Sequence, residues 1–304
     1  MKQYQRIGVF MTGSPADQIA LGFAGNFAKL AQAEKIVCVY VHGGGPESID
    51  DPNIGAEQLR QRVLGVLPSE VSSHTEIDVH AGDGFDDILR TAMERDLDLI
   101  IKGRRLPAHQ SAVGAAFTKL ARKAPCSVLI VPNYCQPHFS RVLVPVDFSN
   151  HSKLAFKEAL EIARAGATAV GEKPQVLIQH VAHVGYGYQK LGLTFEQAMK
   201  QQETAFGPRI AEFLAGSGCS DVDLAAVQLE SICMFSEDTA AAVHELAAAR
   251  KMDMVLIGSR GLTTAAAAIL GSTAEQILLR SPQPVMIVKE KGETRGLLEA
   301  LLGD

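Results

Sequence analysis

The stretch Met254–Gly261 (MVLIGSRG), followed at 271–273 by Gly-Ser-Thr, is the part of the chain that decides its fold. The apolar run at 254–257 has the character of a strand buried on both faces. Glycines directly after a strand let backbone N–H groups approach a ligand closely, because no Cβ stands in the way. Ser272 and Glu275 have the Ser-x-x-Glu spacing of a capping box, which predicts that a helix begins there. Strand, glycine loop and helix N-terminus together predict a phosphate site.

The chain contains one such unit in each half. Three pairs of segments match between the halves: Asp98–Gly103 with Asp253–Gly258, Pro125–Val131 with Pro282–Val288, and Arg6–Thr12 with Arg141–Asp147. Strands alternate with helices in both halves, which predicts parallel β–α–β units with right-handed crossovers. The segment 132–138 has two prolines and no periodicity, so we interpret it as a linker. We therefore expect domains at 1–136 and 137–290 and a tail at 291–304.

Periodicity predicts the individual elements. In the first half we expect strands at 7–11, 35–41, 75–80, 97–102 and 127–131, and helices at 15–32, 57–67, 85–95 and 114–123. In the second half we expect strands at 142–146, 176–181, 223–229, 254–257 and 285–288, and helices at 150–164, 194–215, 237–250 and from 272. Thr194 and Gln197 predict a capping box, and Gly207-Pro208 predicts a break in that helix. A polar loop is expected at 43–54, and four leucines near the end predict a short docked helix in the tail.

Composition limits the class of protein. Hydrophobic residues make up 47% of the 304 positions, which is enough for a substantial core. The net charge of -5 shows that basic residues are not in excess, so we expect no nucleic-acid partner. We also expect no signal peptide and no membrane span, because the apolar runs are short. The five cysteines are odd in number and form no Cys-x-x-Cys, which favours reduced thiols and a cytoplasmic location.

The spacing Gly258-x2-Gly261-x9-Gly271-Ser272 resembles the nucleotide-binding motif of the universal stress protein family, in its ATP-binding branch. With the internal repeat, the resemblance covers nearly the whole chain, which is similar to a tandem universal stress protein. The resemblance implies an α/β fold with two doubly wound, five-stranded parallel sheets of the adenine nucleotide α-hydrolase-like, Rossmann-like type. It also implies strand order 3-2-1-4-5 in each half, with the halves paired through their fifth strands as a pseudo-dimer. Such pairing would cover an apolar edge strand.

The implied strand order places a ligand crevice between the first and fourth strands of the second half. The resemblance puts adenine and ribose near Asp147 and Val181, and the phosphates on the glycine loop and the helix start. The predicted binding residues are Pro145, Val146, Asp147, Val181, Ile257, Gly258, Arg260, Gly261, Gly271, Ser272 and Thr273. The expected ligand is ATP, or else AMP or ADP, with Mg²⁺ held through a water on Asp147. No catalytic residue is assigned, so any ATP hydrolysis should be slow.

The first half departs from this pattern at each important position. Its loop is shorter, and three residues replace Asp147, Gly261 and Ser272, namely Thr12, Leu106 and Ala115. We therefore predict that the first half binds no nucleotide in this manner. Its loop carries Lys102, Arg104 and Arg105, which we interpret as a solvated run of charge.

Two other classes of function remain as alternatives to a nucleotide-binding regulator. The first is a scaffold that only mediates protein association; partner proteins and a homodimer are both compatible with the sequence. The second is an ATP-hydrolysing enzyme of the adenine nucleotide α-hydrolase group, which carries a Ser-Gly-Gly-x-Asp-Ser loop after its first strand. Asp147–Ser152 contains no glycine, which argues against that enzyme. His180 and His183 lack further ligands and form a poor metal site, and the Gly-Tyr-rich segment at 185–188 is expected to be a loop over the crevice.

Overall fold

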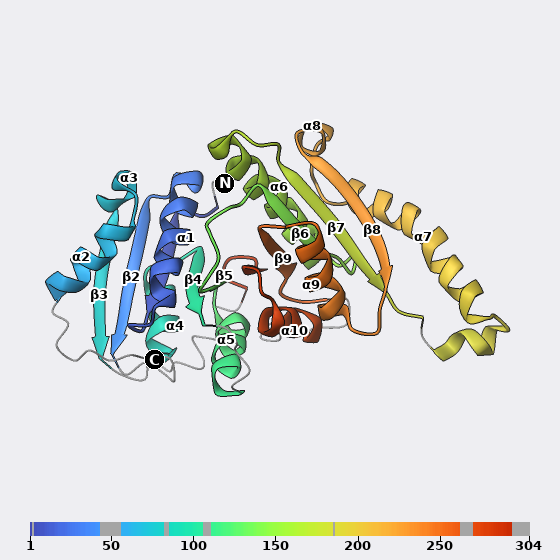
Figure 1. Ribbon diagram of the computed structural model, residues 1–304, viewed down its shortest axis with the longest axis horizontal. Helices are drawn as coiled ribbons and strands as arrows, with labels where there is room; N and C mark the ends of the chain where they lie inside the picture. Colours follow the sequence, from blue (N-terminus) through green and yellow to red (C-terminus); the bar gives the residue numbers. More distant parts are fainter. Residues whose placement is uncertain are drawn as a thin grey trace.

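The structure is a computed structural model that describes residues 1, 3–42, 56–81, 85–105, 111–184, 186–261 and 270–293 (Figure 1). The first half contains β1 (Arg6–Met11), α1 (Ala16–Ala31), β2 (Lys35–His42), α2 (Ala56–Val66), α3 (Ser69–Ser72), β3 (Thr75–Ala81), α4 (Phe85–Glu94), β4 (Leu99–Arg104), α5 (Ser111–Lys123) and β5 (Ser127–Pro132). The second half contains β6 (Arg141–Pro145), α6 (Asn150–Val170), β7 (Gln175–Ala182), the 3₁₀ helix η1 (Tyr186–Leu191), α7 (Phe195–Ala215), α8 (Asp221–Ala225), β8 (Gln228–Phe235), α9 (Thr239–Ala249), β9 (Met254–Gly258), α10 (Ser272–Arg280) and β10 (Val285–Val288).

All ten strands belong to one sheet, in the order β3-β2-β1-β4-β5-β10-β9-β6-β7-β8. Each half therefore has the order 3-2-1-4-5 in its own numbering, as the resemblance implied. Neighbouring strands are parallel within each half, whereas β5 and β10 are antiparallel, with Val285 opposite Ile130. The expected pairing through the fifth strands is confirmed, and it joins the two halves at the middle of the molecule (Figure 1).

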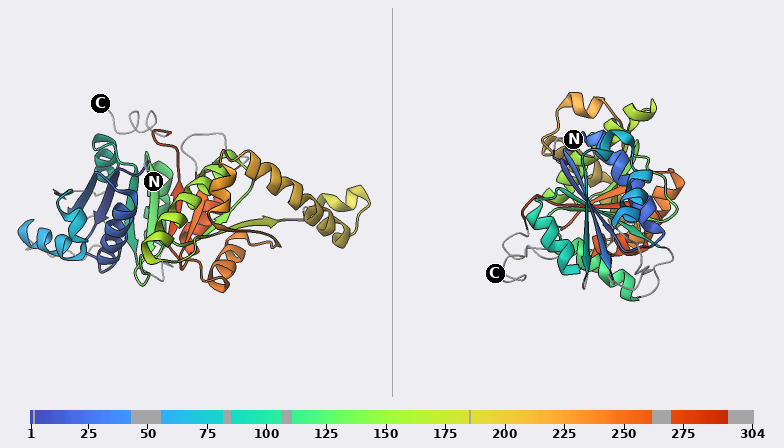
Figure 2. Two further views of the ribbon diagram at one scale, coloured as in Figure 1. Left: turned by 90° about the horizontal axis from the view of Figure 1, so that it is seen from above. Right: turned by 90° about the vertical axis from the view of Figure 1, so that its left-hand side faces the viewer.

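Helices cover both faces of the sheet, as the end-on view in Figure 2 shows. Apolar side chains from α1, α2, α3, α6 and α7 form one core, and those from α4, α5, α9 and α10 form the other. Successive strand residues such as Leu99 and Ile100 belong to opposite cores, because side chains alternate between the faces of a strand. This double burial explains why the central strands are continuous apolar runs.

The two halves also meet through an aromatic cluster. The ring of Phe139, which follows the predicted linker, lies 5.6 Å from that of Phe23 and 5.7 Å from that of Phe27, both in α1. A Cβ at Gly166 of α6 would lie 2.6 Å from the Cβ of Phe139. The close packing of Phe139 against α6 therefore depends on a glycine at this position.

Three predicted elements of the second half differ in the structure. A strand at 223–229 is wrong: Ser220 and Asp223 form a capping box that starts α8, so the strand begins only at Gln228. The predicted break at Gly207-Pro208 is also wrong, since α7 continues through Pro208 on an exposed face where water can satisfy the free carbonyl. Helix α6 extends past 164 to Val170 and ends at Gly171, which has a left-handed φ of 71°.

Some expectations fall outside the described residues, namely the loop at 43–54, most of the tail, and the loop at 262–269. None of the described helices combines the length and the hydropathy needed to cross a membrane.

Candidate functional site

A cavity of about 350 Å³ lies beyond the carboxyl ends of β6, β7 and β9 in the second half. All eleven predicted binding residues line it, from Pro145, Val146 and Asp147 to Gly271, Ser272 and Thr273. Seven further residues complete the lining: Ser152, Gln179, His180, His183, Arg209, Thr239 and Ala274. The cavity occupies the place where strand order reverses between β9 and β6, the usual ligand position in such sheets.

Hydrogen bonds from the start of α6 hold the carboxylate of Asp147. Its Oδ1 accepts the N–H of Ser149 at 3.0 Å and the hydroxyl of Ser152 at 3.1 Å. Ser149 itself caps α6 by accepting the N–H of Ser152 at 3.2 Å, as predicted. Asp147 is therefore not the helix cap, and its carboxylate is held at the wall of the cavity.

The three motif glycines have different environments. A Cβ at Gly258 would lie 2.6 Å from the carbonyl carbon of His151, so this glycine admits the first turn of α6 against β9. A Cβ at Gly261 would lie 2.6 Å from Oδ2 of Asp147, whereas a Cβ at Gly271 would meet nothing closer than 3.8 Å. The first glycine thus serves packing, the second leaves room for the carboxylate, and the third keeps the cavity wall open.

The predicted capping box at Ser272 and Glu275 is wrong. Gly271 is the N-cap of α10, and no side chain caps the helix. The side chain of Glu275 turns instead to Arg122 of α5, at 3.0 Å. The first bond of α10 runs from the N–H of Glu275 to the carbonyl of Gly271, so earlier N–H groups have no acceptor within the helix. The helix N-terminus is therefore more open to an anion than the sequence suggested.

Two arginines line the cavity on different elements. Arg260 follows β9 and forms an ion pair with Glu293. Arg209 comes from α7 and lies over the ring of Phe148, with its guanidinium carbon 4.0 Å from the ring centre. Sequence reasoning missed Arg209, because nothing in the pattern places α7 beside the ends of β6 and β7.

Both histidines at the end of β7 are engaged by the protein. Nδ1 of His180 lies 2.9 Å from the carbonyl oxygen of Val146, and burial lowers the pKa of this ring. Nε2 of His183 lies 3.0 Å from the hydroxyl of Thr239. Within the described ranges, no cluster of three or more His, Cys, Asp or Glu side chains could hold a metal ion.

Gln179 supplies a polar atom that fits a ligand. Its side-chain nitrogen donates to the carbonyl of Ala242 at 3.0 Å, which fixes the amide orientation. Its Oε1 is buried without a partner in the part of the chain that the structure describes, and the residue lines the cavity. A buried acceptor is costly when unsatisfied, so a donor on a ligand would stabilise it.

At the equivalent place in the first half, a buried lysine contacts other side chains of that half. The ammonium group of Lys102 lies 3.3 Å from the hydroxyl of Thr12 and 3.8 Å from Oδ1 of Asp17. By the repeat, Thr12 and Asp17 correspond to Asp147 and Ser152, so the acid and the hydroxyl have exchanged positions between strand end and helix.

The predicted solvated charge run in this loop is wrong for two of its three members. Lys102 is 9% exposed because it pairs with Asp17, and Arg104 is 1% exposed because its guanidinium donates to carbonyls of the second half. Only Arg105 is exposed.

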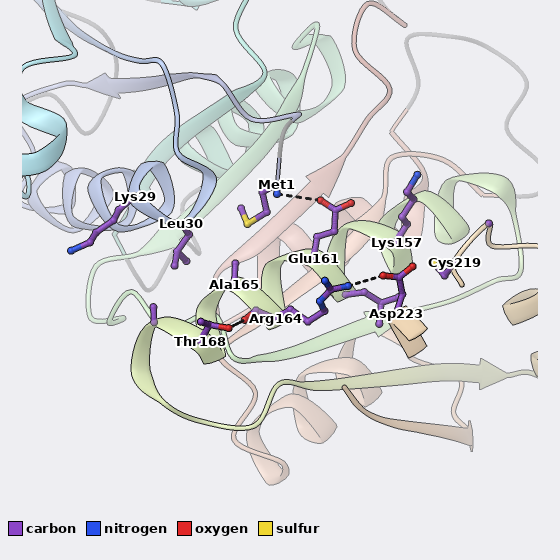
Figure 3. A pocket seen from close by; sticks show the side chains of 13 residues that line it. Met1, Lys29, Leu30, Lys157, Glu161, Arg164, Ala165, Thr168, Cys219 and Asp223 are labelled. Atoms are coloured by element: carbon purple, nitrogen blue, oxygen red, sulfur yellow. Dashed lines mark hydrogen bonds and ion pairs between the residues drawn. The ribbon is translucent and has the colours of Figure 1, made fainter. Parts of the chain in front are cut away.

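A second cavity, of about 630 Å³, lies at the seam between α1 and α6 (Figure 3). Most of its charges are already matched: the Met1 amine lies 3.5 Å from Glu161, and Arg164 lies 2.7 Å from Asp223. Lys29 at its rim pairs with Glu70 at 2.7 Å. This groove therefore offers a charged ligand less than the cavity of the second half.

Comparison with known proteins agrees with this architecture. A curated universal stress protein from Thermus aquaticus, from the QAH/OAS sulfhydrylase 3′ region, is 28% identical over 152 residues, which is 50% of this chain and 99% of that protein. A functionally unknown protein from Pseudomonas aeruginosa has a similar structure, with a TM-score of 0.65 at 19% identity over 98% of this chain and 96% of its own. A universal stress protein from Archaeoglobus fulgidus gives a TM-score of 0.61 at 18% identity, covering 94% and 99% of the two chains. The Universal stress protein family matches residues 3–132 and again 138–289, and the chain therefore belongs to that family, with one copy of its domain in each half.

Proposed function

We propose that this protein binds an adenine nucleotide, ATP or else ADP or AMP, in the cavity of its second half, and acts as a regulator in a stress response. One observation carries the proposal: the residues that the sequence nominates for this ligand, although spread from 145 to 273, line one cavity. That cavity adjoins the open N-terminus of α10. Such an arrangement suits a phosphorylated ligand, because free N–H groups and the helix dipole both favour negative charge.

The lining suggests how the nucleotide would lie. Its phosphates would contact the first turn of α10 and Gly261, where added side chains would intrude. The ribose would lie at Asp147, and the base would lie over the end of β7 near Val181. There, Oε1 of Gln179 would accept a hydrogen bond from the amino group of adenine.

The binding of Mg²⁺ would depend on a bound nucleotide, because the phosphates would supply ligands to the ion. Mg²⁺ commonly binds through one or two carboxylates, substrate phosphates and several waters, and Asp147 is the acid that lines this cavity. Asp147 would hold the ion through a water, while the phosphates supply the remaining ligands. His180 is already bonded to Val146 and has a lowered pKa, so it is a poor candidate for activating water. We expect hydrolysis to be slow and the bound state itself to be the signal.

The test begins with the purified protein. It would be denatured, any released nucleotide identified by mass spectrometry, and ATP, ADP and AMP titrated by calorimetry. Asp147→Ala and Gly271→Val should abolish binding, whereas Gly65→Val adds the same side chain in open space on α2 and should leave binding intact. If the wild type and Gly65→Val release no nucleotide and bind none, the proposal fails and a scaffold for protein association becomes the leading function.

Association between copies is a separate question. The fifth strands are already paired with each other inside one chain. A homodimer, which the sequence left open, would therefore need a different surface, and sedimentation with and without ATP would reveal it.

A further inference from the structure

Arg104, the last residue of β4, reaches from the first half into the second. It is 1% exposed, one of the largest fully buried side chains of the molecule. Its Nη1 donates to the carbonyls of Leu278 and Leu279, the latter at 3.3 Å, and its Nη2 donates to the carbonyl of Ser281. These carbonyls lie at the C-terminal end of α10, where no later N–H group of the helix can donate to them.

Arginine is well suited to this position. The guanidinium presents several donors in a rigid plane and keeps its charge when buried. A cation at a helix C-terminus also stabilises the helix dipole. Neighbouring residues of the first half reinforce the attachment, because the hydroxyl of Tyr134 donates to the carbonyl of Pro282 at 3.2 Å.

The opposite end of α10 faces the cavity. Ser272 and Thr273 of its first turn line the cavity, and the whole helix has only nine residues, so the carbonyls that Arg104 contacts lie at the other end of a short element. A short helix packed in this way moves as a unit, so its position at one end determines the position of its N–H groups at the other. On the phosphate side no side-chain cap holds it.

The first half has a similar contact in the reverse direction. Lys289, just after β10, is buried and donates to the carbonyls of Arg122 at 3.1 Å and Ala124 at 2.8 Å, at the end of α5. Burial lowers the pKa of Lys289 to about 8. A buried cation of each half thus donates to carbonyls at the end of the last helix of the other half, which is α10 for Arg104 and α5 for Lys289. Of these two helices, α10 is the one whose N-terminus lies at the nucleotide cavity.

We propose that Arg104 is a positioning residue for nucleotide binding: through the C-terminus of α10, the first half sets the phosphate-binding end of that helix. This inference rests on the proposed function for its effect on affinity. Its structural part, that Arg104 orders α10, stands independently. The first half would then contribute to the site of the second half although, in the first half itself, Lys102 replaces Ile257 and pairs with Asp17.

Three variants of the full chain test the inference. Arg104→Met removes the donors but keeps an apolar side chain of similar length, and Arg104→Lys keeps a charge without the planar fork. Lys289→Met is the matched control, because it removes the equivalent contact on α5. Calorimetry would give the ATP dissociation constant at a temperature where every variant is folded, and hydrogen exchange would give the protection of the amides at 275–281 without ligand.

We expect Arg104→Met to weaken ATP binding about tenfold and to speed exchange across 275–281, since three buried carbonyls lose their donors. Arg104→Lys should recover most of both, and Lys289→Met should speed exchange in α5 while changing ATP affinity less than about twofold. Wild-type affinity in Arg104→Met, or an equal loss in Lys289→Met, would overturn the inference. If the wild type binds no ATP, the proposed function fails, and exchange alone decides: unchanged protection of 275–281 in Arg104→Met refutes the positioning role. If Arg104→Met does not fold, Arg104→Gln, which lacks both the charge and the planar fork, takes its place with the same expected and refuting results.

Discussion

Replacing each glycine of the motif by alanine should separate packing from binding. At Gly258 the new Cβ would lie 2.6 Å from a backbone carbon of His151 and 2.7 Å from its oxygen. At Gly261 it would lie 2.6 Å from a carboxylate oxygen of Asp147, and at Gly271 it would have ordinary contacts. One chemical change at three positions therefore meets a rigid backbone at Gly258, a movable side chain at Gly261 and only ordinary van der Waals contacts at Gly271.

The expected magnitudes follow from those distances. The backbone of α6 has little freedom to retreat, so Gly258→Ala should cost about 3 kcal/mol, the upper part of the range for overpacking. For a unit of this size that lowers the melting temperature by roughly 6–12 °C. Gly261→Ala should cost about 1 kcal/mol of stability, because the carboxylate can rotate, but should weaken nucleotide binding about tenfold, or 1.4 kcal/mol. Gly271→Ala should lower the free energy of unfolding by only about 0.5–1 kcal/mol, the cost of replacing an N-cap glycine by the poorer N-cap residue alanine.

Thermal and urea unfolding would measure the losses of stability, and calorimetric titration with ATP would measure the change in nucleotide affinity. Gly103→Ala is the matched control in the first half, where the Cβ would lie 2.2 Å from the carbonyl oxygen of Ala16. It should destabilise the protein at least as much as Gly258→Ala while leaving ATP affinity unchanged in the folded fraction. A Gly258→Ala protein as stable as the wild type would refute the assignment of that glycine to packing.

Three further outcomes are expected. Glu293→Gln should strengthen ATP binding about threefold in calorimetry, because Arg260 would lose a competing carboxylate; unchanged affinity would mean that Arg260 does not face the phosphates. Arg209→Met should weaken binding about threefold, and less at high salt, since a cation held over Phe148 would be lost from the lining. Burial lowers the pKa of His244 from 6.5 to about 4, so the unfolded chain binds more protons between these values and stability should fall as pH drops through that window. Urea unfolding at pH 7.5 and 5 should show a smaller drop for His244→Leu than for the wild type.

The sequence predicted the sheet well because the pattern there is set by burial. Runs such as 254–257 and 128–131 are apolar at every position, and only a strand covered on both faces requires that. The same clarity is missing at 223–229, where an apolar alternation competes with the Ser220–Asp223 capping box. The hydrogen bonds of this capping box stabilise the short helix α8 there instead of a strand.

The predicted binding residues lie together because their spacing follows from the order of the strands. Arg209 and Gln179 could not be found in that way. Arg209 belongs to the long helix α7, which packs on Phe148 through Arg209 and Phe213, and no period in the sequence encodes such packing.

The charged loop of the first half shows why charge alone is a poor guide to exposure. Lys102 stands where Ile257 stands in the other half, so a cation replaces an apolar residue that lines the cavity there. A buried lysine needs a nearby acid. Asp17 supplies it, and burial raises the pKa of that acid although Lys102 acts in the opposite direction.

The differences between the two halves at these positions form one consistent change, not simply the loss of individual binding residues. Moving the acid from the strand end at Thr12 to the helix at Asp17 turns it from a wall of the crevice into the partner of Lys102. Lys102→Ile alone should therefore not restore a nucleotide site, because it would leave Asp17 buried and unpaired and should destabilise the fold instead. The double variant Lys102→Ile with Asp17→Ser should recover stability relative to the single one, as measured by urea unfolding. A single Lys102→Ile variant as stable as the double would show that the ion pair does not hold the first half together.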